Sequence, residues 1–187
     1  RGDEMPETKK KYAQKTNVRS LSAALVNADI FLGLSGPGLV REEWIKSMAN
    51  KPLVLALANP IPEILPEEVK KVKPDAIIAT GRSDYPNQVN NVLCFPFIFR
   101  GALDVGATVI NEEMKIAAVN AIAELAQAET SEIVSNAYGD ADLSFGPEYI
   151  IPTPFDPRLI IKIAPAVAKA AIQSGVATLP INDFNIY

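Results

Sequence analysis

Two uninterrupted apolar segments restrict the folds open to this chain more than any other feature of its 187 residues. Residues 53–58 are apolar at every position, and residues 76–80 repeat the pattern with a single terminal threonine. A strand with one face in water alternates apolar and polar side chains, whereas a strand covered on both faces of a parallel sheet is apolar throughout. Both segments are therefore predicted to be buried strands of an α/β fold.

Helical segments separate these strands from each other and from an earlier apolar run. Residues 29–34 form that earlier predicted strand, and helices are expected over residues 40–49 and 66–72. Three strands joined through helices predict a partial doubly wound, Rossmann-like parallel sheet. In such a sheet, ligands bind at the carboxyl ends of the strands.

The remainder of the chain is predicted to be mainly helical. Apolar residues at helical spacing predict further helices over residues 6–28, 97–105, 112–128 and 158–175. The last three of these give the sheet a C-terminal helical part. A proline-rich connector occupies residues 146–157, and residues 176–187 are expected to be extended.

Composition and charge exclude several function classes. The net charge of −4 leaves no basic surface for nucleic acid, and no apolar run approaches the roughly 18 residues of a membrane span. Without histidine the chain has no Ser-His or Cys-His nucleophile pair, and one cysteine, Cys94, allows neither an internal disulfide nor a multi-cysteine metal site. We therefore expect no nucleic acid or membrane partner and a cytoplasmic location.

Neutral amide side chains gather where the predicted strands end. Asn59 directly follows one strand. The loop after the next strand holds four amides: Asn87, Gln88, Asn90 and Asn91. Amides donate and accept hydrogen bonds at fixed geometry without charge, so the cluster predicts a site for a small polar ligand. Structural roles stay open as well, since Asn before Pro favours a turn and either Asn90 or Asn91 can cap a following helix.

The first predicted strand ends in a glycine-rich turn, Ser35-Gly36-Pro37-Gly38, whose glycines allow a ligand to approach the backbone. A nucleotide-binding sheet of this kind carries a glycine fingerprint in its first strand-turn-helix unit, and no such fingerprint occurs here. Either that unit lies upstream or the protein does not bind a nucleotide. Because the chain opens with Arg1-Gly2-Asp3-Glu4, we expect a fragment of a longer polypeptide.

Several longer motifs resemble the cofactor domain of bacterial malic enzymes. The matching segments are Leu57-Ala58-Asn59-Pro60, residues 79–92 (ATGRSDYPNQVNNV), residues 95–104 (FPFIFRGALD), residues 110–115 (INEEMK) and residues 149–158 (YIIPTPFDPR). They extend over nearly the whole chain and are far more specific than a glycine pattern alone. Residues 175–181 also resemble the exit from the malic part of large hybrid enzymes, where a phosphotransacetylase-like region follows.

This resemblance implies an activity. Members of the family oxidise malate by hydride transfer to NADP or NAD and then decarboxylate the product to pyruvate, with the help of Mg²⁺ or Mn²⁺. Their proton-donating tyrosine, lysine base, acidic metal ligands and glycine fingerprint match nothing in this chain. The resemblance thus implies a fragment that holds no catalytic residue or metal ligand and is inactive alone, within a homo-oligomeric enzyme that binds malate or pyruvate and a nicotinamide dinucleotide.

The resemblance also implies roles for particular residues. Asn59 matches the family's asparagine that meets both cofactor and substrate. Asn90 and Asn91 match the amides that reach the bound malate. Ser35 and Gly36 match the backbone that passes beneath the nicotinamide ring. The expected site therefore lies across all three strand ends.

Lys9 is the remaining cofactor candidate, because NADP-using relatives place cations here against the ribose phosphate. A run of three lysines is otherwise a solvated helix face. Residues 1–175 are accordingly predicted to be the later part of the NAD(P)-binding domain, without its first strand-turn-helix unit, and residues 176–187 a C-terminal linker. Two alternatives stay open: a Rossmann-like nucleotide-binding module without chemistry, and a fragment whose C-terminal helices form an oligomer contact.

Overall fold

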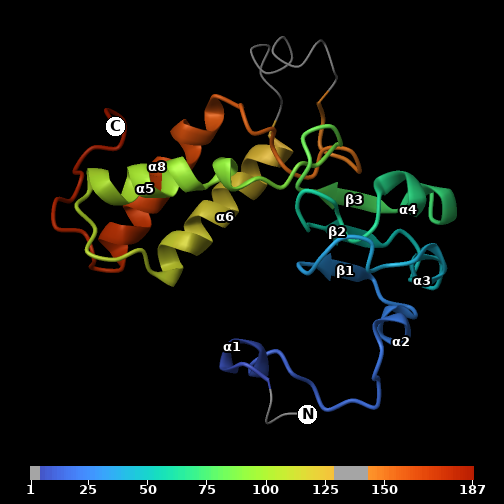
Figure 1. Cartoon of the computed structure of the whole chain (residues 1–187). Helices are drawn as coiled ribbons and strands as arrows, with labels where there is room; N and C mark the ends of the chain where they lie inside the picture. The colour runs from blue at the N-terminus through green and yellow to red at the C-terminus, as the bar shows by residue number, and fades with distance from the viewer. Residues whose placement is uncertain (1–4, 129–142) are drawn as a thin grey trace.

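The computed structural model describes residues 5–128 and 143–187, which form a small parallel sheet and a neighbouring group of helices (Figure 1). The sheet contains β1 (Ile30–Gly33), β2 (Leu53–Ala56) and β3 (Ile77–Thr80), in the order β1-β2-β3. Both pairings are parallel, and Leu53 lies beside both Ile30 and Ile77. The predicted class, a partial Rossmann-like parallel sheet followed by C-terminal helices, is confirmed.

Three short helices pack on one face of this sheet: α2 (Leu21–Leu25), α3 (Glu42–Lys46) and α4 (Pro66–Val72). The core between these helices and the strands contains Leu25, Phe31, Ile45, Val54, Val69 and Ile78. Burying each of these large side chains contributes roughly 1.5 to 3 kcal/mol, so this core holds the strands and their ends in register. The alternate residues of β1, Ile30 and Leu32, face away from it and are 59% and 56% exposed.

A second core lies among the C-terminal helices α5 (Phe95–Asp104), α6 (Glu112–Gln127) and α8 (Arg158–Gln173). Asn111 caps the start of α6, where its side chain accepts a hydrogen bond from the Met114 N–H at 3.1 Å. Helices α5 and α8 touch through their backbones, because a methyl group on Gly101 would lie 2.4 Å from the Ala164 carbonyl oxygen. None of the described helices combines the length and the apolarity that crossing a membrane requires.

The predicted helix over residues 6–28 is wrong. The chain there forms α1 (Glu7–Lys10), an irregular stretch, and then α2. No residue of α1 is buried, so the apolar residues that suggested one long helix have no core to pack against. Ser20 starts a separate helix, because its side chain accepts a hydrogen bond from the Ala23 N–H.

The C-terminal residues 176–187 contain no helix or strand, yet they pack along the helical core. Ile181 and Phe184 lie against that core, and the Lys169 ammonium group sits 4.8 Å from the centre of the Phe184 ring. The Tyr187 hydroxyl donates a hydrogen bond to the Asp104 carboxylate of α5. The domain boundary expected after residue 175 stays a prediction.

Candidate functional site

The carboxyl ends of the three strands meet at one edge of the sheet, because all three strands run in the same direction. The turn with Ser35 follows β1, Asn59 lies shortly beyond β2, and Gly81 directly follows β3. The loop after Gly81 then returns to the same edge, where the Val89 N–H donates to the Thr80 carbonyl at 2.8 Å. The segment that leads to Asn91 therefore starts beside the end of β3.

Asn59 is exposed, and its side chain lies against the backbone of Gly81. A methyl group built on Gly81 would come within 2.8 Å of Asn59 Nδ2 and 2.9 Å of Oδ1, so only glycine leaves room for this amide. Within the described residues the Asn59 side chain has no hydrogen-bond partner of its own. Its donors and acceptor are therefore available to a ligand.

Glu63 is a buried acid at the same edge. It is 1% exposed, and its two oxygens accept hydrogen bonds from the N–H groups of Ser35 at 2.8 Å and Ala58 at 3.1 Å. The turn after β1 and the residue before Asn59 are thus joined by one carboxylate.

The first two amides of the loop after β3 serve the fold. Asn87 is 6% exposed and adopts a left-handed backbone conformation with φ of 55°. Its Nδ2 donates to the carbonyls of Ile78 and Pro147 at 2.9 and 2.8 Å, and its Oδ1 accepts from the Ile150 N–H at 2.8 Å. Gln88 donates from Nε2 to the Gly81 carbonyl at 3.4 Å. These bonds fix the loop against β3.

The two following asparagines differ in what they contact. Asn90 caps the short helix η1 (Asn91–Leu93), because its Oδ1 accepts a hydrogen bond from the Val92 N–H at 3.1 Å. Asn91 is exposed, and its side chain hydrogen-bonds no other residue in the described part of the chain. Of the pair, Asn91 therefore has the amide that is free to meet a ligand.

Arg82 and Asp84 pair with each other in the same loop. The guanidinium donates from Nε and Nη2 to the two Asp84 oxygens at 2.8 and 2.5 Å. The hydrogen bond to Asp84 raises the pKa of Arg82, and the same bond lowers the pKa of Asp84. Both charges are thus paired within the loop, whereas the amides of Asn59 and Asn91 have no partner among the described residues.

Lys9 is not brought to the strand ends. It lies in α1, which in Figure 1 stands apart from the sheet at the end of an irregular N-terminal stretch. The structure therefore gathers Ser35, Gly36, Asn59 and the Asn90-Asn91 pair at one edge and leaves Lys9 outside this group.

At the strand ends the turn after β1 has open backbone, and the described residues hold no group of metal ligands. The turn after β1 is open, since a methyl group on Gly36 would meet only Leu39, at 4.0 Å. Among residues 5–128 and 143–187, no three His, Cys, Asp or Glu side chains are grouped so as to hold a metal ion. The described residues therefore do not fit a divalent cation.

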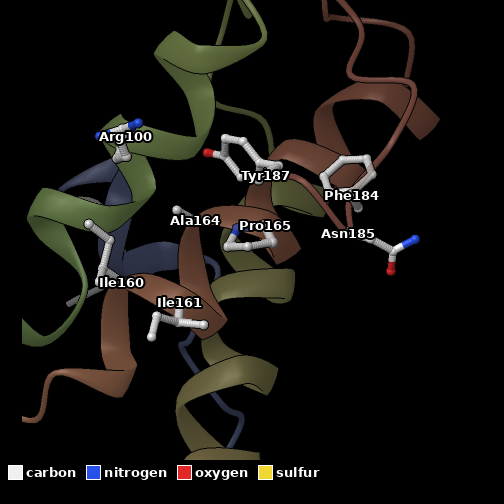
Figure 2. A pocket seen from close by; sticks show the side chains of 8 residues that line it. All are labelled: Arg100, Ile160, Ile161, Ala164, Pro165, Phe184, Asn185 and Tyr187. Atoms are coloured by element: carbon white, nitrogen blue, oxygen red, sulfur yellow. The ribbon is translucent and has the colours of Figure 1, made fainter.

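A separate pocket of about 420 Å³ opens between α5, α8 and the C-terminal residues (Figure 2). Ile160, Ile161 and Pro165 supply apolar walls, and the Tyr187 hydroxyl points toward Arg100. Burial, together with the hydrogen bond to Asp104, raises the pKa of Tyr187 to about 12. No residue predicted for the site lines this pocket, so it is distinct from the strand ends.

Sequence reasoning missed Glu63 and the structural role of Asn87. Glu63 carries a weak signal, because it is an acid within the otherwise apolar and proline-rich residues 60–66. Asn87 carries none that separates it from its neighbouring amides. In both cases one partner lies far away along the chain, Ser35 at 28 positions from Glu63 and Pro147 at 60 positions from Asn87.

The chain is similar in sequence and structure to several known proteins. The NADP-dependent malic enzyme of Escherichia coli is 71% identical over 184 residues, which cover 98% of this chain and 24% of that enzyme. The NAD-dependent malic enzyme of Rhizobium meliloti is 60% identical over 183 residues, with the same coverage. The crystal structure of the Entamoeba histolytica malic enzyme superimposes with a TM-score of 0.75 at 44% identity, over 89% of this chain and 32% of that one.

The chain thus spans about a quarter of the length of these two curated relatives. The family model described as "Malic enzyme, NAD binding domain" matches residues 2–136, which include every strand of the sheet and every residue of the strand-end edge. This chain therefore belongs to the malic enzyme family and forms part of its NAD(P)-binding domain.

Proposed function

We propose that these residues form one wall of the malate and NAD(P) site in a longer enzyme that oxidises malate and decarboxylates it to pyruvate. The observation that carries this proposal is the pair of exposed amides at the strand ends, Asn59 and Asn91, whose side chains have no partner among the described residues. They lie where ligands bind in open parallel sheets.

The chemistry of an amide suits the substrate. An amide NH₂ donates to a carboxylate with defined direction and adds no charge of its own, so it orients malate without binding it as tightly as a cation does. The exposed Asn91 side chain, beyond the loop, is assigned to a malate carboxylate. Asn59, packed on Gly81, is assigned to the reacting end, where substrate and nicotinamide meet.

The cofactor is assigned to the turn after β1. Ser35 and Gly36 offer backbone with space above it, and a bound nicotinamide accepts the hydride that malate loses. Relatives that use NADP and relatives that use NAD are both close to this chain. Lys9 lies in α1, outside the strand ends, and is assigned to the ribose 2′-phosphate of NADP, a part of the cofactor distinct from the nicotinamide.

The groups that move protons and bind the divalent cation are assigned to other parts of the longer enzyme. The family's tyrosine acid, lysine base and acidic metal ligands match nothing in the sequence of this chain, which supports this assignment. What this chain contributes is the positioning of substrate and cofactor, not the acid, the base or the metal ligands.

The experiment compares two proteins, each supplied with malate, Mn²⁺ and NADP or NAD. One is the full-length enzyme, meaning the complete polypeptide that carries these residues, and the other is the 187-residue chain. The full-length enzyme is expected to produce NADPH or NADH together with pyruvate, and the short chain neither. A full-length enzyme without malate-dependent activity contradicts the proposed reaction, whereas turnover by the short chain places the catalytic groups within it.

We further propose that the full-length enzyme is a homo-oligomer. Phe95, Phe99 and Leu103 recur every four residues along α5, each is exposed, and the two phenylalanine rings lie 5.0 Å apart. Exposed apolar stripes of this kind mark protein contacts. Sedimentation of the full-length enzyme is expected to give a multiple of the monomer mass, and a monomer at micromolar concentration contradicts the assignment.

A further inference from the structure

Among the described residues, Glu63 is the buried acid at the strand ends, and the proposed reaction does not use it. We propose that it is a positioning residue, which holds the cofactor turn at Ser35 and the strand end at Asn59 in a fixed relation. The inference rests on the proposed function in assigning those two segments to cofactor and substrate. The two hydrogen bonds that join Glu63 to Ser35 and Ala58 form a clamp, which is a property of the fold and can be tested without the reaction.

The Glu63 carboxylate joins the two chain segments just beyond the point where the backbone hydrogen bonds between β1 and β2 end. The last ladder bond runs from the Leu57 N–H to the Gly33 carbonyl at 3.1 Å. Beyond it, the amides of Ser35 and Ala58, each two residues past the end of its strand, donate to Glu63 Oε1 and Oε2. One side chain therefore lies between the two strand ends and sets how far apart they stand.

Glu63 is held in place through its own backbone. Its carbonyl accepts from the Val40 N–H at 3.1 Å, and the preceding Pro62 carbonyl accepts from the Gly38 N–H at 3.1 Å. The segment that carries the acid is thus joined to the far end of the glycine-rich turn. With the two carboxylate bonds, four hydrogen bonds connect this segment to the residues on either side of the site.

The sequence around the clamp is fitted to the acid. A methyl group on Gly33 would lie 2.5 Å from the Glu63 carboxyl carbon and 2.8 Å from each oxygen. A glycine at the end of β1 is therefore required for the carboxylate to reach between the strands. Glu63 and Gly33 form a matched pair, and a double substitution can test it.

Burying an acid costs folding free energy, so a role in stability alone does not explain Glu63. At 1% exposure it has given up its hydration, and no Lys or Arg nitrogen of the described residues lies within 4.0 Å of it. In the described part of the chain its oxygens accept from two backbone N–H groups, whereas a buried apolar side chain would fill the space without the cost of removing a polar group from water. In exchange for this cost, the carboxylate fixes the spacing between the Ser35 turn and the Asn59 strand end, which both face the ligand edge.

The test uses the full-length enzyme with Glu63→Gln, which keeps the length of the side chain but replaces one acceptor oxygen with an NH₂ that cannot accept. Glu43→Gln is the matched control, since Glu43 is an exposed acid of α3 whose carboxylate lies 3.9 Å from Arg41. Amide hydrogen exchange is measured over residues 33–40 and 56–60, together with kcat and KM for malate.

Glu63→Gln is expected to speed exchange in both segments by about tenfold and to lower kcat by about tenfold or more at saturating substrates, while KM for malate changes little. Glu43→Gln is expected to match the parent. Unchanged exchange in either segment, or kcat within twofold of the parent, overturns the inference. If the parent lacks malate-dependent activity, the proposed function fails and the exchange result alone decides the clamp.

Rescue separates positioning from general destabilisation. Gly33→Ala is expected to lower kcat/KM about tenfold through collision with the carboxylate, and adding Glu63→Asp, which shortens the acid by one methylene, is expected to regain activity over Gly33→Ala alone. Purely additive losses in the double variant, measured on protein of equal folded fraction, contradict the matched pair.

Discussion

The side chain amide of Asn59 lies directly against the Cα of Gly81, so close that a methyl group there would come within 2.8 Å of Nδ2. These two residues follow neighbouring parallel strands, β2 and β3. Glycine at the end of one strand therefore leaves the space that the amide at the end of the other strand occupies. The orientation of Asn59 depends on the backbone of the next strand rather than on a hydrogen bond of its own.

Gly81→Ala in the full-length enzyme is expected to displace Asn59 while leaving the fold intact. The crowded atoms belong to an exposed side chain that can move away, so the melting temperature should change little. A displaced catalytic-site amide should lower kcat/KM for malate by about 10- to 100-fold. Gly146→Ala is the control, because a methyl there meets only the Ser144 carbonyl oxygen at 3.8 Å. Equal activities of the two variants contradict this reading of the contact.

Asn87→Ala is expected to lower the stability of the fold, whereas Gly81→Ala is expected to lower activity. It removes three hydrogen bonds of a buried side chain, and alanine tolerates the left-handed backbone at this position less well than asparagine. Unfolding in urea should show a loss of about 2 to 4 kcal/mol. Asn50→Ala, at an exposed position, should change the free energy of unfolding by less than about 0.5 kcal/mol. A loss at Asn87 as small as at Asn50 would mean that the loop is held by other contacts.

The fold could be predicted where burial leaves a continuous mark on the sequence. Residues 53–58 and 76–80 indicated β2 and β3, and helices α4, α5, α6 and α8 occupy the regions that apolar spacing predicted. The N-terminal helix failed because helical spacing was read without a core to receive it: Tyr12 is 71% exposed. Spacing shows which side chains can share a face, but not whether anything packs on that face.

The location of the site could be predicted from the sequence because the ends of the strands could be predicted. Asn59 and the Asn90-Asn91 pair were placed at the sheet edge because amides followed two predicted strands. A capping role for Asn90 or Asn91 could be foreseen, because the capped N–H lies only two residues away, whereas the role of Asn87 could not, since its partner Pro147 lies 60 positions along the chain. The buried contacts of Glu63 were missed for the same reason.

Asn91→Asp in the full-length enzyme is expected to weaken malate more than Asn91→Ala does. Aspartate keeps the volume of asparagine but replaces two donor hydrogens with a negative charge that faces an anionic substrate, so repulsion adds to the lost hydrogen bond. KM for malate and for NADP are measured separately for both variants. Equal effects of the two substitutions, or a loss confined to NADP, assign Asn91 to the cofactor instead.

Lys9→Ala tests the cofactor choice. NAD has no 2′-phosphate, so loss of an ammonium group that meets this phosphate should lower kcat/KM for NADP and leave the NAD value nearly unchanged. A charge-assisted contact of this kind should lower the NADP/NAD ratio by about five- to thirtyfold. Lys10→Ala is the control, because Lys10 pairs with Glu7. Parallel changes for both cofactors would make Lys9 a solvated lysine and move cofactor selection elsewhere.

The placement of the active site at the strand ends is tested by kcat/KM for malate in the full-length enzyme with Asn59→Ala. Asn59 has no partner among the described residues, so the substitution should leave the free energy of unfolding nearly unchanged. If its amide meets substrate and nicotinamide, its removal should cost about 2 to 4 kcal/mol of transition-state stabilisation, a fall of about 30- to 900-fold in kcat/KM. A value within about threefold of the parent would make Asn59 only the residue that starts the turn at Pro60, and would contradict the placement of the active site at these strand ends.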